Sequence, residues 1–146
     1  MYSIRCIPLV NSPNYNYKDP IYTKSLVAQR YHGIFPYDIT NPYIGRFIYN
    51  YEHGNYSPGR HWSSHTFLIY LSSAFVLKFF YSPWNEHMIK RKLQIGATLS
   101  KQSIQMGLGT HHVITREELE KTYMQYAQQT EDLRLIPEYK QLFNFM

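Results

Sequence analysis

Two histidine pairs come nearest to a site for chemistry in this sequence. His61 and His65 are four residues apart, so on a helix they would share one face and could contribute to a metal or haem site. Two ligands do not complete such a site, and no Glu lies between them as in the zinc-protease motif. We therefore expect this pair to form interfacial hydrogen bonds. His111 and His112 are adjacent, a spacing that directs two side chains differently on a helix or strand.

Other catalytic patterns are missing from the sequence. Glu117, Glu118 and Glu120 are the closest group of carboxylates, and at the start of a predicted helix they complement the helix dipole. Cys6 is the single cysteine, which excludes an internal disulfide and a zinc site built from several thiolates. The sequence therefore predicts a protein without catalytic activity, cofactor, metal or small-molecule substrate.

Composition favours a chain that is built for contacts with partners. The 146 residues include 15 Tyr, 8 Phe and 2 Trp, and aromatic side chains bury large areas at interfaces. Eight prolines and seven glycines are spread along the chain, so we expect no independent globular core. The net charge of +5 is diffuse, with no run of five basic residues, and gives no indication of nucleic-acid binding.

The most informative segment is residues 62–84, an apolar stretch with Lys78 as its single formal charge. As a helix it would measure about 34 Å, against about 30 Å for the hydrocarbon core of a bilayer. The pattern predicts one transmembrane helix, with a buried helix of a soluble protein as the alternative. The residues assigned to the span and its aromatic belts are Trp62, Phe67, Leu68, Ile69, Leu71, Phe75, Val76, Leu77, Phe79, Phe80, Tyr81 and Trp84.

Basic side chains lie within and after this segment. A Lys near the middle of a span costs about 3 kcal/mol, against roughly 3 to 5 kcal/mol contributed by the apolar residues, unless it reaches the nearer membrane surface. We expect Lys78 to extend to that surface in this way. The cluster of Lys90, Arg91 and Lys92 is expected to meet anionic lipid headgroups.

Residues 1–61 are predicted to be an N-terminal extramembrane arm with two short helices. Asp19-Pro20 and Asn41-Pro42 are each typical of a helix start, which places helices at about residues 20–32 and 42–53. The rest of the arm is expected to be extended.

Residues 85–146 are predicted to be a C-terminal extramembrane region. Thr115 and Glu118 form a capping box, which predicts a helix over about residues 116–130. Its apolar stripe of Leu119, Tyr123 and Tyr126 is expected to dock on a partner. The predicted fold class is therefore mainly α, with a single transmembrane helix between short amphipathic helices and extended arms.

The order of features in the middle of the chain resembles a known family. Asn41-Pro42 begins a predicted helix that carries Arg46, Phe47 and Tyr49, and one span and a basic exit follow. This arrangement resembles the beta subcomplex subunit four family of mitochondrial respiratory complex I over residues 41–92. The resemblance implies a single-pass accessory subunit of the inner mitochondrial membrane, without catalytic activity, whose partners are other subunits and membrane lipids.

Alternative functions remain open. Cytochrome c oxidase or ATP synthase are alternative host complexes, since one belted span between two docking regions suits each of them. A basic soluble accessory protein of the mitochondrial ribosome is an alternative of another class, because the charge of +5 and the interleaved aromatic residues also suit RNA.

The orientation of the predicted span is open. Basic residues after the span predict that the C-terminal side lies in the matrix, whereas the resemblance implies the reverse orientation.

Overall fold

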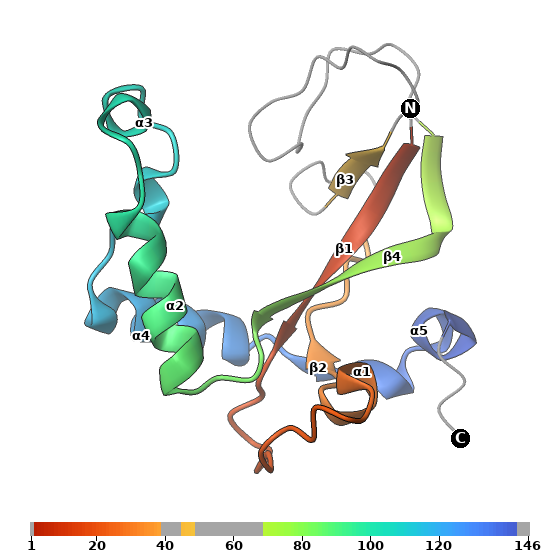
Figure 1. The fold of residues 1–146 in the computed structure, drawn as a ribbon. Helices are drawn as coiled ribbons and strands as arrows, with labels where there is room; N and C mark the ends of the chain where they lie inside the picture. Colours follow the sequence, from red (N-terminus) through yellow and green to blue (C-terminus); the bar gives the residue numbers. More distant parts are fainter. Residues whose placement is uncertain (1, 39–44, 49–68, 143–146) are drawn as a thin grey trace.

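The computed structural model describes residues 2–38, 45–48 and 69–142 and has a mixed α/β fold (Figure 1). Its described strands form one sheet of five, and helices pack against this sheet from the C-terminal half of the chain. The prediction of a mainly α protein without a core of its own is therefore wrong. Among the described residues, no helix combines the length and the apolar character that crossing a bilayer requires.

Strand β1 (Tyr2–Val10) is the centre of the sheet. On one side it pairs in parallel with the long strand β4 (Ile69–Tyr81), with register shifts after Ile4 and after Leu9. On its other side it pairs antiparallel with β3 (Gly45–Ile48) and β2 (His32–Gly33). A further antiparallel pair joins β2 to β5 (Glu131–Asp132). Strand β5, from the C-terminal part of the chain, therefore lies at this edge of the sheet.

The prediction of a transmembrane helix at residues 62–84 is wrong, because strand β4 occupies most of that segment. A helix in lipid must be apolar on all sides, whereas a strand needs only one buried face. Phe75, Leu77 and Phe79 alternate toward a buried core, and Lys78 between them is exposed. Aromatic and β-branched residues also favour strands. The lysine that is costly in a membrane therefore reaches water at no cost in a strand.

One face of the sheet is covered by the C-terminal end of the chain, and we call the buried cluster there the C-terminal core. The 3-10 helix η4 (Leu133–Leu135) and helix α5 (Pro137–Leu142) lie over it. Its fully buried side chains include Ile7 and Leu9 from β1 and Tyr139 from α5. Residues 133–142 therefore pack on the sheet of their own chain.

The other face is covered near the ends of β1 and β4 by helices α2 (Glu86–Ala97) and α4 (Arg116–Ala127), and we call this cluster the helical core. Trp84 stacks on Tyr123 with ring centroids 4.0 Å apart and planes 9° from parallel. Asn11 ties the same region together, because its backbone N–H donates to the carbonyl of Tyr81 and its carbonyl accepts from the Tyr123 hydroxyl. The two strands and α4 are therefore fixed to one another.

Helix α4 begins where the capping box places it. The Thr115 hydroxyl accepts from the backbone N–H of Glu118, and the Glu118 carboxylate accepts from the backbone N–H of Thr115. Gly107 and Gly109 lie in a turn, and both have positive φ. This turn follows the short helix α3 (Lys101–Gln105) and precedes the 3-10 helix η3 (Thr110–His112).

The N-terminal helices differ from the prediction. Of residues 20–32, only α1 (Leu26–Gln29) is helical, and His32 already belongs to β2. The Gln29 side chain accepts from the backbone N–H of Ile21 and donates to its carbonyl, which holds the preceding residues in a turn. Residues 45–48 of the second predicted helix form strand β3, and the remainder of 42–53 lies outside the described residues.

The register of β1 against β4 can be tested with the single cysteine of the chain. Cys6 is the register partner of Val76, and neighbouring strands lie about 4.8 Å apart, a separation that a disulfide can bridge. We expect Val76→Cys to form an intramolecular disulfide with Cys6 under mild oxidation, seen as faster migration on a non-reducing gel. Leu77→Cys is the matched control, because its side chain points to the opposite face. Equal cross-linking of the two variants would contradict the register.

Candidate functional site

The residues assigned to a membrane span are divided between the two faces of the sheet. Ile69 and Leu71 lie on β4 opposite Tyr2 and Ile4, and Val76 lies opposite Cys6. Side chains of the C-terminal core are Phe75, Leu77 and Phe79, and those packed in the helical core are Phe80, Tyr81 and Trp84. Trp62, Phe67 and Leu68 lie outside the described residues. Six of the residues assigned to the span therefore pack in the cores of this chain.

The predicted docking stripe of α4 also faces its own chain. Leu119 and Tyr123 are buried in the helical core and Tyr126 packs against it, which corrects their assignment to a partner surface. Of the family-like motif, Arg46 and Phe47 lie on β3 opposite Ile4 and Ser3. Asn41, Pro42 and Tyr49 lie outside the described residues, as do His61 and His65.

A lysine-aromatic cluster forms where β4 faces α2, and it is our candidate site. The Lys92 ammonium group of α2 lies 4.1 Å from the centre of the Phe80 ring and 4.2 Å from that of Tyr81. The Lys78 ammonium group of β4 lies 4.6 Å from the same Phe80 ring. Two cations from different elements therefore meet at one ring, whose negative face attracts both.

The charges around this cluster are positive. Burial, and then the positive charges of Lys78 and Arg91, lower the pKa of Lys92 to about 8. The pKa of His112 is also lowered, first by burial and then by His111, Lys92 and Lys78. A lowered pKa means that the charged form is disfavoured. Lys92 and His112 therefore both lie near other basic side chains.

Helices α2 and α4 hold Lys92 in place. Asn85 caps α2, because its side-chain oxygen accepts from the backbone N–H of Met88. The guanidinium of Arg116 binds both carboxylate oxygens of Glu86 at the start of α2 and also donates to Glu120 at 2.8 Å. These exposed ion pairs contribute little stability, yet they align the starts of the two helices.

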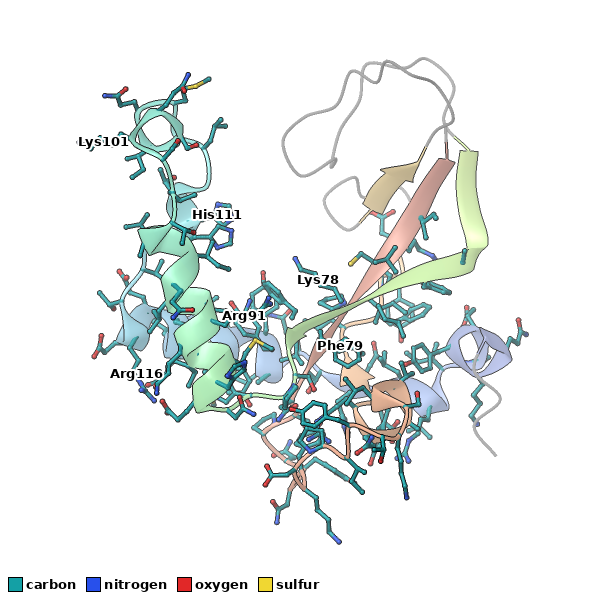
Figure 2. The ribbon with its side chains drawn as sticks, in the orientation of Figure 1. Lys78, Phe79, Arg91, Lys101, His111 and Arg116 are labelled. Atoms are coloured by element: carbon teal, nitrogen blue, oxygen red, sulfur yellow. The ribbon has the colours of Figure 1, made fainter. Side chains whose placement is uncertain are left out.

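Gly96 of α2 allows η3 to lie against the helix. A Cβ atom at Gly96 would be 2.5 Å from the backbone oxygen of His112, closer than any side chain tolerates. His112 is therefore brought to the helix that carries Lys92. Figure 2 shows His111 of η3 extending toward the sheet, and Lys78 of β4 extending toward the helices.

Sequence reasoning missed two features of this cluster. Lys78 and Phe80 are two residues apart, so a strand assignment would have placed them on one face. Nothing in the sequence indicates that Lys92 returns to the same ring.

A second polar cluster lies beside β2. The Tyr17 hydroxyl and Nδ1 of His32 are 2.7 Å apart, and Arg134 lies over the Tyr31 ring at 3.5 Å. Burial raises the pKa of Tyr17 to about 12 and lowers the pKa of His32, so both side chains are neutral near pH 7. This arrangement anchors the segment after β1 to the sheet.

Metal ligands do not gather in the described part of the chain, where no three His, Cys, Asp or Glu side chains could hold one ion. Comparison with known proteins adds no relative: no family model, curated protein or solved structure matches this chain.

The electrostatic coupling within the lysine-aromatic cluster can be measured by titration. We expect the Lys92 side chain to titrate with a midpoint near pH 8 when its Cε resonance is followed by NMR. Lys78→Gln should raise this midpoint, because removing a positive neighbour favours the protonated form. Lys140→Gln, a change of equal charge on α5, should leave it in place. A midpoint unaffected by Lys78→Gln would show that the two ammonium groups do not share a site.

Proposed function

We propose that this chain is a non-catalytic accessory subunit of a larger protein assembly. The observation that carries the proposal is a group of exposed apolar side chains on residues 101–113, which we call the arm tip. Its exposed members are Ile104, Met106, Leu108 and Val113. Met106 and Val113 are 64% and 58% exposed. Figure 1 shows that the helices of residues 86–127 project from the sheet, with α3 at their far end.

Exposed apolar side chains gathered on one projection favour contact with another protein. Each would gain about 25 cal/mol for every Å² of apolar surface removed from water, and such patches mark interaction sites. Covering the arm tip leaves the two cores intact, because its exposed apolar side chains belong to neither of them. We infer that a neighbouring subunit covers it.

The proposed host is the membrane arm of mitochondrial respiratory complex I, with cytochrome c oxidase and ATP synthase as alternatives. This host is proposed from the resemblance over residues 41–92, although Arg46 and Phe47 lie on strand β3 and not on the helix that carries them in the resemblance. In this proposal the chain is held by protein contacts at the arm tip. The predicted spanning helix has no part in it.

A second candidate is an accessory protein of the mitochondrial ribosome. The lysine-aromatic cluster favours it, since cations interleaved with aromatic rings also suit RNA phosphates and bases. Identification of the proteins that migrate with the tagged chain in a native gel separates the two hosts. Respiratory-complex subunits support the first, and ribosomal proteins support the second.

The role of the arm tip is tested by adding a charge to it. We expect Met106→Asp with Val113→Asp to reduce the assembled fraction of the tagged chain about tenfold or more on native gels, because a buried carboxylate in an apolar contact costs well over 1.4 kcal/mol. Gln102→Asp adds charge to the same α3 at an exposed polar position and should assemble normally. Circular dichroism confirms that both variants fold. Undiminished assembly of the double variant would refute docking through the arm tip.

A further inference from the structure

Charged side chains of opposite sign are separated along the helices that carry the arm tip. Residues 87–115 contain no Asp or Glu. Their Lys and Arg residues are Lys90, Arg91, Lys92 and Lys101. This part of the chain includes α3, η3 and all of α2 after its first residue, so the arm tip belongs to a purely basic segment.

The carboxylates on either side of this segment lie at the other end of α2. Glu86 is the first residue of α2, and Arg116 at the start of α4 binds it. A helix of twelve residues measures about 18 Å, whereas charges in water are screened beyond about 8 Å at physiological ionic strength. Figure 2 shows Lys101 and Arg116 at opposite ends of these helices. These carboxylates therefore do not neutralise a charge at the arm tip.

Lys101 brings one positive charge to the apolar side chains of the arm tip. It is the first residue of α3, and Ile104 lies one turn later on the same face of that helix. The turn after α3 folds back on the helix, because the backbone N–H of Leu108 donates to the carbonyl of Ser103 at 2.8 Å. Lys101 is exposed, and within the described ranges no ion pair includes it.

We infer that the arm tip binds an apolar surface of another protein that is bordered by Asp or Glu side chains, one of which pairs with Lys101. The inference rests on the proposed function and adds the chemistry of the partner. Protein interfaces have an apolar centre and a polar rim, and opposite charges at the rim orient the partners. Met106 is a flexible side chain that adapts to an apolar partner surface.

A different protein fits the arm tip better than a bilayer or a second copy of this chain. Residues 101–113 contain no Trp, Tyr or Phe, the side chains that favour a bilayer surface, although the chain is rich in them. Two arm tips in contact would bring like charges together, which is unfavourable. Glu86 and Glu120, which a second copy could offer to Lys101, are already bound by Arg116.

The carboxylate that faces Lys101 can be identified by cross-linking without a spacer. A carbodiimide activates an Asp or Glu carboxylate, and attack by the Lys101 amine forms an amide with release of a urea. In the isolated assembly of the tagged chain, we expect mass spectrometry to find Lys101 joined to an Asp or Glu of a different protein. Links from Lys101 to a second copy of this chain, or to no carboxylate, would overturn the inference.

Charge reversal at Lys101 gives a second measurement. We expect Lys101→Glu to lower the assembled fraction at least about fivefold on native gels, because it places a carboxylate opposite carboxylates. Lys101→Arg keeps the charge and should assemble normally. Lys140→Glu makes the same reversal at an exposed position of α5 and should change assembly less than about twofold.

The results separate this inference from the proposed function. Normal assembly of Lys101→Glu, with assembly lost in Met106→Asp with Val113→Asp, keeps docking through the arm tip and overturns the acidic border. Normal assembly of both refutes the docking and the inference together. Lys101-dependent sedimentation of the purified chain with phosphatidylserine vesicles, without a cross-link to another protein, also overturns it in favour of a lipid surface. If Lys101→Glu does not fold by circular dichroism, the cross-link in the unaltered chain decides.

Discussion

The parallel pairing of β1 with β4 is the constraint on which the rest of the structure depends. It joins the N-terminal strand to a segment some seventy residues later in the sequence. Each strand supplies alternate residues to two faces, so one pairing creates the surfaces for both cores. Ile7 and Leu9 enter the C-terminal core, whereas Val10 enters the helical core. Loss of this pairing would leave α5 and α4 without the apolar surfaces on which they pack.

The lysine-aromatic cluster is a consequence of the same pairing. The alternation that buries Leu77 and Phe79 turns Lys78 and Phe80 to the opposite face, where α2 covers the end of the sheet. The stack of Trp84 on Tyr123 and the cap at Asn85 then fix where α2 begins, and with it the position of Lys92. Lys78 therefore lies beside the Phe80 ring because residues two apart on a strand share one face.

The sequence predicts local structure here better than it predicts the sheet. The capping box of α4 depends on neighbouring residues, and it is present in the structure. Strand β4 carries apolar residues on both faces, with Lys78 as its single charge, so periodicity alone cannot distinguish a buried strand from a helix. The pairing of β4 with β1, which lies some seventy residues earlier, leaves no pattern in the sequence of either strand. For the same reason the sequence singles out Lys78 and Lys92 as basic residues but does not predict that both lie beside the Phe80 ring.

The central claim is that residues 75–81 form a strand that is paired with β1. Backbone Cα and Cβ chemical shifts of the full chain, measured by NMR together with amide exchange, test it most directly. The structure predicts strand-like shifts from Phe75 to Tyr81 and slow exchange of the amides that pair with β1. Helical shifts that continue through these residues, with sequential amide contacts along them, would contradict the sheet and both cores built upon it.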